Sequence, residues 1–209
     1  MGRRAHMRIY SYVVARDYGF APNPFHGYCT LATCKPLIRR VAKVGDWVVG
    51  TGSAKNKRQG FLVYAMKVTE VATFEAYWDD SRFLEKRPNL HGSVKQAYGD
   101  NIYHRAEGSG AWVQEDSHHS LENGATNLAN LNVDTQAPQV LISEDFAYYG
   151  GEGPRIPAEL RNSGGYDICA SRGHKSDFPA GLVKNFETWF RSLGENGYLG
   201  APVDWRLNH

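Results

Sequence analysis

The sequence of 209 residues has few cysteines, and it lacks long apolar runs, repeats and low-complexity segments. Three cysteines, an odd number, argue against a disulfide scaffold and fit a reducing compartment, so we expect a cytoplasmic protein. No apolar run approaches the ~20 residues that span a bilayer, and we expect no membrane partner. The segment 1–6 lacks the apolar core of a signal peptide, and we interpret it as an added leader before a native start at Met7.

The composition is that of an ordinary globular protein, with 42% hydrophobic and 22% charged residues. This length can bury one good core, so a single domain over residues 7–209 is predicted. The charge is unevenly distributed, because residues 1–70 carry twelve Lys and Arg against three Asp and Glu, whereas residues 71–209 carry twelve against nineteen. The basic N-terminal third favours a phosphate-binding face, unless the two parts simply complement each other within one fold.

The segment 44–71 predicts a β-hairpin. Apolar and β-prone residues at 47–49 and 61–66 flank a polar connection that is rich in glycine. Such a loop suits an anionic or nucleotide-like ligand, because glycines let backbone N–H groups approach and cations neutralise charge. The alternative is a solvated turn that only keeps the chain soluble. The candidate ligand-binding residues of this loop are Ser53, Lys55, Lys57 and Arg58.

Strands and helices are both predicted elsewhere in the chain. Residues 8–15 and 139–143 are β-prone, and residues 35–43, 73–80 and 182–193 have helical spacing, the second of these with Thr73 as N-cap. Residues 121–133 carry four asparagines and a glycine, which predicts a loop. These elements indicate an α+β fold with a mixed or antiparallel sheet.

The loop 17–28 holds two prolines, two glycines and four aromatic residues, an unusual content for a connection. Aromatic side chains on a loop stiffened by proline either fill a core or form a wall on which a base stacks. The sequence leaves both readings open. The aromatic candidates for stacking, here and further along the chain, are Tyr18, Phe20, Phe25, Trp47 and Trp112.

Polar and titratable residues are dense between positions 98 and 120. Amides, carboxylates, imidazoles and aromatic rings in one segment suit the reading of base edges and equally suit acid–base catalysis. A polar surface loop is the plain alternative. For an enzyme, the catalytic candidates are His104, Glu115, Asp116, His118 and His119. For a binding protein, the candidates in this segment are Asp100, Asn101, Tyr103 and Gln114.

No metal or other cofactor is predicted. Adjacent residues on a strand point to opposite faces, so His118 and His119 do not easily share one ion. The spacing of His26, Cys29 and Cys34 supplies only three ligands, and we expect these cysteines to be small buried thiols.

The run IYSYVVARDYGFAPNPFHGYCTLATCKPLIRRVAKVGDWVVGTGS resembles the start of the bacterial and phage nucleotide modification associated domain proteins. The segments 80–88, 98–104, 112–120 and 140–146 resemble the same family, so the resemblance runs from Met7 to about residue 190. The family is associated with DNA base modification and phage–host conflict, with no assigned activity. The resemblance therefore implies DNA or a nucleotide as ligand, and DNA-modification proteins as partners.

A second likeness concerns the fold. The pattern from KVGDWVV through VTEV to YWDDSRFLEKRP is similar to PUA-like domains of the EVE, YTH and ASCH families. Those domains are small β-barrels that hold an extruded base in an aromatic pocket. This similarity implies a PUA-like mixed or antiparallel barrel with flanking helices.

Three functional hypotheses follow. The favoured one is a binding module that recognises a modified base, with Arg39, Arg40 and the hairpin cations on phosphate. The second is an enzyme that acts on nucleotides or DNA bases through histidine and carboxylate acid–base chemistry. The third is an accessory subunit of a modification complex.

Overall fold

The computed structural model describes residues 7–169 and 173–208, and the predicted leader lies outside this part of the chain. The chain divides into two compact units. The first unit comprises residues 1–17, 42–69 and 144–209, and the second comprises residues 18–41 and 70–143. Among the described residues, no helix is long and apolar enough to cross a membrane.

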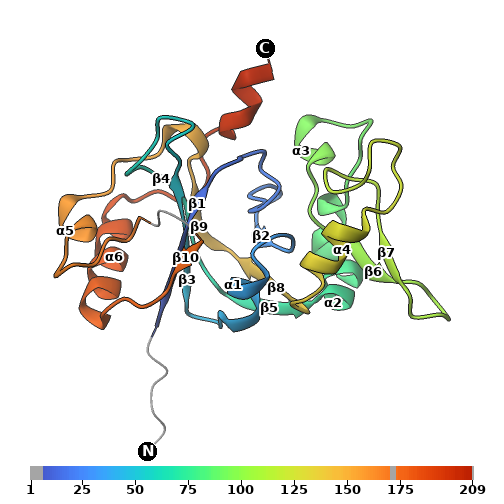
Figure 1. Cartoon of the computed structure of the whole chain (residues 1–209), viewed down its shortest axis with the longest axis horizontal. Helices are drawn as coiled ribbons and strands as arrows, with labels where there is room; N and C mark the ends of the chain where they lie inside the picture. Colours follow the sequence, from blue (N-terminus) through green and yellow to red (C-terminus); the bar gives the residue numbers. More distant parts are fainter. Residues whose placement is uncertain (1–6, 170–172, 209) are drawn as a thin grey trace, which may run out of the picture. The chain divides into compact units, whose positions relative to one another are not determined.

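The first unit contains a six-stranded mixed sheet (Figure 1). In sheet order its strands are β10 (His174–Lys175), β1 (Ile9–Val14), β3 (Trp47–Gly52), β4 (Leu62–Lys67), β9 (Asp145–Tyr148) and β11 (Gly197–Tyr198). β1 lies parallel to β3, and β9 lies parallel to β11, whereas the other neighbours are antiparallel. The antiparallel pair β3 and β4 confirms the predicted hairpin, with a register shift at Gly50 and Thr51.

Helices α5 (Ala158–Arg161) and α6 (Ala180–Ser192) lie on one side of this sheet (Figure 1). The predicted helix 182–193 is confirmed by α6, whose apolar face packs against the buried residues of β1 and β3. Trp47 is fully buried there, with its ring centroid 5.5 Å from Phe186 and 4.9 Å from Phe190. The stacking role expected for Trp47 does not fit this position, because the side chain is fully buried. Two 3₁₀ helices complete the unit, η2 (Gly150–Glu152) and η3 (Val203–Asn208).

The second unit contains two smaller antiparallel sheets. One is three-stranded, in the order β2 (Cys29–Leu31), β8 (Gln139–Ser143) and β5 (Glu70–Thr73), and the other pairs β6 (Tyr103–Arg105) with β7 (Trp112–Gln114). The helical segments are α1 (Pro36–Val41), α2 (Phe74–Asp79), η1 (Ser81–Lys86), α3 (Val94–Ala97) and α4 (Leu128–Asp134).

Two local predictions in this unit have different outcomes. The Thr73 cap of α2 is confirmed, because its side chain accepts a hydrogen bond from the Ala76 backbone N–H. The predicted loop at 121–133 is wrong at its C-terminal end, where α4 begins after Asn127. The Asn127 side chain accepts from the Asn130 N–H, so an asparagine taken as a loop signal is the helix cap.

The α+β class is confirmed, but the PUA-like barrel is not. In the part of the chain that the structure describes, each of the three sheets has two free ends in its strand order. A closed barrel requires the first and last strands to pair. The sheets are therefore open, and their edge strands are short, with two to four residues each.

Candidate functional site

Cys34 lies on a tight turn between strand β2 and helix α1. Cys34 and the next residue, Lys35, both have left-handed backbone angles, with φ of 56° and 43°. Such angles are unfavourable for residues other than glycine and occur where surrounding contacts enforce them. Here the Cys34 N–H donates to Asp134 Oδ1 at 2.7 Å, and its carbonyl accepts from Arg39 Nε at 2.8 Å. The strand–turn–helix arrangement thus holds a half-buried thiol in one position.

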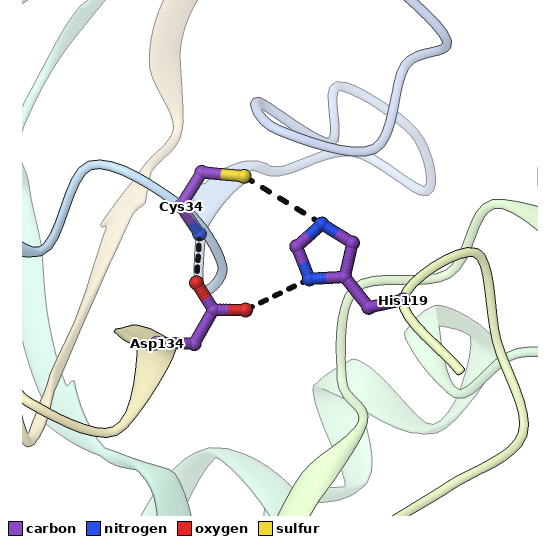
Figure 2. Close-up of side chains that lie close together, drawn as sticks. All are labelled: Cys34, His119 and Asp134. Carbon is purple, nitrogen blue, oxygen red and sulfur yellow. Dashed lines mark hydrogen bonds and ion pairs between the residues drawn. The ribbon is translucent and has the colours of Figure 1, made fainter. Parts of the chain in front are cut away.

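His119 faces this thiol. Its Nε2 lies 3.7 Å from Cys34 Sγ, and its Nδ1 donates to Asp134 Oδ2 at 2.8 Å, as Figure 2 shows. The backbone of His119 is also fixed, because its carbonyl accepts hydrogen bonds from Asn130 Nδ2 at 2.9 Å and from Gln114 Nε2 at 3.3 Å. The three side chains form a cysteine–histidine–aspartate triad, in which the carboxylate orients the imidazole toward the sulfur.

Asp134 ends helix α4 and is almost fully buried. Besides the two bonds to the triad, its Oδ2 accepts from the Tyr103 hydroxyl at 2.9 Å. Burial, together with the neighbouring Asp134, raises the pKa of Tyr103 well above its ordinary value, so the phenol remains a neutral donor. Gln114 Nε2 in turn donates to the Tyr103 oxygen at 3.1 Å. Each bond to the carboxylate comes from a donor, which keeps a buried negative charge in one orientation.

Arg39 supports the triad from within the protein. Its buried guanidinium donates to the main-chain carbonyls of Cys34, Asp134, Ala137 and Gln139. One side chain thereby connects the turn that carries the thiol to the end of the helix that carries the carboxylate. The predicted phosphate contact of Arg39 is wrong, because the side chain has no exposed surface and its donors are used by these carbonyls.

The electrostatics favour a charged imidazole. Burial opposes protonation of His119, but the hydrogen bonds to Asp134 and Cys34 and their charges outweigh it and raise its pKa to about 9. At neutral pH the imidazole can therefore hold a proton while its Nε2 faces the sulfur of Cys34, and a cationic histidine next to a cysteine is a known arrangement in cysteine nucleophiles. Lys35 adds a second positive charge in this region; burial lowers its pKa, and Cys34 acts in the opposite direction.

The same three residues could also be considered as metal ligands, since their ligand atoms all lie within 4.8 Å of one another. A zinc site needs at least three protein atoms that are free to coordinate. Here both Asp134 oxygens accept hydrogen bonds, and one of these bonds holds the His119 ring. Asp134 therefore acts as an orienting group behind His119, and the arrangement fits a nucleophilic triad better than a metal site.

The structure separates the catalytic candidates of the sequence. His104 and Glu115 form a pair of their own, with 2.8 Å between Nε2 and Oε1, and the His104 ring stacks on Trp78 at 4.0 Å. Asp116 is exposed. His118 is exposed too and contacts aromatic rings, whereas its neighbour His119 enters the triad.

Several binding candidates are buried, so the predicted ligand contacts do not fit them. Asp100 accepts from the hydroxyls of Thr30 at 2.8 Å and Tyr77 at 2.7 Å, and Asn101 donates to two carbonyls. Phe25 and Ser53 are also covered. Burial and internal hydrogen bonds give these side chains structural roles.

Other binding candidates lie at the surface. Arg40 in the second unit and Lys55 and Lys57 in the first unit are exposed. Arg58 is half-buried, donating to the Gly153 carbonyl at 2.8 Å. Trp112 is half-buried under the Arg105 guanidinium, whose carbon lies 3.6 Å from the centre of a Trp112 ring.

The comparisons with known proteins agree with the resemblance in sequence. The model of the family described as Nucleotide modification associated domain 2 matches residues 6–209, nearly the whole chain. The chain belongs to this family. No curated protein and no solved structure matches it. Membership of the family gives a nucleotide modification context.

Two triad residues of this family member were missed in the sequence. We expected Cys34 to be a buried thiol, but it is half-buried and faces His119. Asp134 follows a segment that was predicted as loop, and nothing near it in the sequence indicates a catalytic role. A signal was present in principle, since a cysteine with a histidine and an aspartate elsewhere in the chain is a known pattern for a nucleophile.

Proposed function

We propose that this protein is an enzyme of nucleotide modification that uses Cys34 as a covalent nucleophile. The observation that carries the proposal is the triad geometry, in which His119 lies between the thiol and a buried carboxylate. The family supplies the context of nucleotide modification. The enzyme hypothesis from sequence is thereby refined from histidine acid–base chemistry to nucleophilic catalysis in which His119 transfers the proton.

The reaction has two halves. The Cys34 thiolate donates an electron pair to an electrophilic carbon of the substrate and forms a carbon–sulfur bond, while the leaving group departs with its own bonding pair and takes the proton from His119 Nε2. Water or an acceptor hydroxyl then attacks the same carbon, gives its proton to His119 and releases the sulfur as thiolate. Asp134 stabilises the imidazolium in both halves.

The test is mass spectrometry of nucleotides and DNA oligonucleotides, with plain and modified bases, after incubation with the protein. We expect a change in substrate mass with the wild type and none with Cys34→Ser. Acid quenching of the wild type should trap the substrate on Cys34. A matched control is Cys169→Ser, which alters another half-buried thiol outside the triad. Turnover that survives Cys34→Ser would refute the proposal.

A second candidate function, recognition of a modified base without chemistry, is favoured by the exposed cations of the β3–β4 hairpin. Lys55 and Lys57 are exposed on a connection whose Lys57 has φ of 54°. Reversing the charges of Lys55, Lys57 and Arg58 to Glu should lower DNA affinity. The slope of log affinity against log salt concentration should become shallower by an amount that corresponds to up to about three phosphate contacts. Unchanged affinity and salt slope would exclude this placement of the DNA. Comigration with a neighbouring modification protein would instead favour an accessory subunit.

A further inference from the structure

Four aromatic side chains of the second unit form a continuous group that reaches the triad. We propose that this ring cluster, Tyr18, Phe20, Tyr98 and His118, binds a planar heteroaromatic ring, namely the base of a nucleotide. The inference rests on the proposed function and names the part of the substrate that the site recognises. It assigns the base itself, and not the sugar or the phosphate, to this position.

The ring cluster has a defined geometry. Tyr18 and Tyr98 stack with centroids 5.4 Å apart and planes 11° apart. The His118 ring lies 4.7 Å from Tyr18 and 5.2 Å from Tyr98. Phe20 lies 5.3 Å from His118 and 4.6 Å from the catalytic His119. The rings therefore lead step by step from Tyr18 and Tyr98 to the imidazole that faces the thiol.

Exposure within the ring cluster is graded. Phe20 is buried, Tyr18 and Tyr98 are half-buried, and His118 is exposed. Phe20 belongs to the hydrophobic core of the second unit, and Tyr18 and Tyr98 pack at the edge of that core. Rings that a core holds in place and that solvent can reach suit the stacking of a flat ligand. A base that stacked on His118 would lie next to a ring whose centroid is 6.1 Å from that of His119, the histidine that faces Cys34.

Internal hydrogen bonds fix the two segments that carry the rings. Asn23 Nδ2 donates to the Tyr98 carbonyl at 2.9 Å, which ties the loop of Tyr18 and Phe20 to the segment of Tyr98. The buried Lys86 ammonium donates to Asn23 Oδ1 at 2.6 Å and to the Tyr28 carbonyl at 3.0 Å, within the same loop. A rigid aromatic surface loses little conformational freedom when a ligand binds.

The two most deeply buried cations of this unit are not available to bind a phosphate. Lys86 and Arg39 are fully buried, and their hydrogen bonds go to carbonyl oxygens and to the Asn23 side chain. Flat rings and imidazoles recognise a base by its faces and edges. The chemistry of the ring cluster is therefore that of a base site, whereas Lys35 is a cation beside Cys34.

The test measures binding to Cys34→Ser protein, so that no turnover disturbs the equilibrium. The probes are the four deoxynucleoside 5′-monophosphates and deoxyribose 5-phosphate, titrated by calorimetry. We expect at least one nucleotide to bind tenfold or more tightly than the sugar phosphate. Adding Tyr18→Ala or His118→Ala should weaken that nucleotide about tenfold, whereas Tyr18→Phe should keep its affinity. Tyr166→Ala, which removes an exposed tyrosine of the first unit, is the matched control and should change nothing.

The outcomes separate this inference from the proposed function. Base-selective binding that depends on the ring cluster, without any turnover in the wild type, supports the base site and refutes the enzyme. Turnover through Cys34 with a KM that Tyr18→Ala and His118→Ala leave unchanged supports the enzyme and overturns the base site. Equal binding of nucleotide and sugar phosphate, or no binding of any nucleotide, also overturns it. Since Tyr18→Ala could disturb folding, the exposed His118→Ala variant with an unchanged melting temperature decides.

Discussion

Three histidine–carboxylate pairs lie in the described part of the second unit, and two of them, at His104 and His119, differ in what the other ring nitrogen faces. In both pairs the nitrogen and oxygen atoms are 2.8 Å apart. In the first pair the Glu115 side chain is 40% exposed, and His104 Nδ1 lies 3.2 Å from the Arg105 carbonyl. The His119 pair uses a carboxylate that is 2% exposed, and its second nitrogen faces a thiol. The chemical role of a histidine–carboxylate pair therefore depends on the group that the other ring nitrogen faces.

The largest expected difference lies between the buried arginine that supports the triad and an exposed arginine of the same unit. Arg39→Ala should destabilise the protein by about 3 kcal/mol or more, because each buried carbonyl left without a donor costs ~1–3 kcal/mol. Arg82→Ala removes an exposed arginine that pairs with Asp80 and Glu70, and it should cost about 0–1 kcal/mol. Urea unfolding of both variants measures this. Equal and small losses would show that Arg39 does not hold the triad together.

The next difference is thiol reactivity. His119→Ala should slow alkylation of Cys34 by iodoacetamide at pH 7 about tenfold, because a free thiol is only a few per cent thiolate at that pH. His104→Ala should leave the rate within a factor of about two, since its ring contacts Trp78 and Glu115 and no thiol. Peptide mass spectrometry gives the rate for Cys34 alone. A similar effect of both substitutions would remove the distinction between the pairs.

The smallest difference concerns pH. Because the pKa of His119 is raised to about 9, its interactions stabilise the folded state fully below pH 6.5, and this contribution is lost as the pH rises toward 9. Asp134→Asn should flatten the stability curve in that range by on the order of 1 kcal/mol. A stability curve whose slope Asp134→Asn leaves unchanged would contradict the coupling of His119 to Asp134. Denaturant midpoints from pH 6 to 9 decide between these outcomes.

The elements built from contiguous residues could be predicted from the sequence. The hairpin of β3 and β4 and the helix α6 follow from alternation and helical spacing over short segments. His119 was among the predicted catalytic residues because its surroundings in the sequence are rich in titratable groups.

The rest of the site depends on contacts between distant positions. Cys34 lies 85 positions from His119 and 100 positions from Asp134, and no local pattern reveals such contacts. Arg39 has the sequence surroundings of a surface cation on an amphipathic helix, yet four carbonyls brought by the fold take up its guanidinium. Likewise, Trp47 was a candidate for stacking because of its aromatic ring, but in the fold it packs against Phe186 and Phe190 of helix α6. Tertiary contacts thus determine the roles of residues such as Arg39 and Trp47, because their neighbours in the sequence do not specify those roles.

The most direct test of the account compares the alkylation rates of Cys34 and Cys169 in the wild type from pH 5 to 9. Both thiols are half-buried, but only Cys34 faces a histidine that is held by a carboxylate. Burial and Asp167 raise the pKa of the Cys169 thiol to about 11, so this thiol serves as the slow reference. We predict that Cys34 reacts faster below pH 8 and that His119→Ala slows Cys34 about tenfold and leaves the rate of Cys169 unchanged. If Cys34 reacts no faster than Cys169, and His119→Ala changes neither rate, then the triad does not activate the thiol and the proposed enzyme is contradicted.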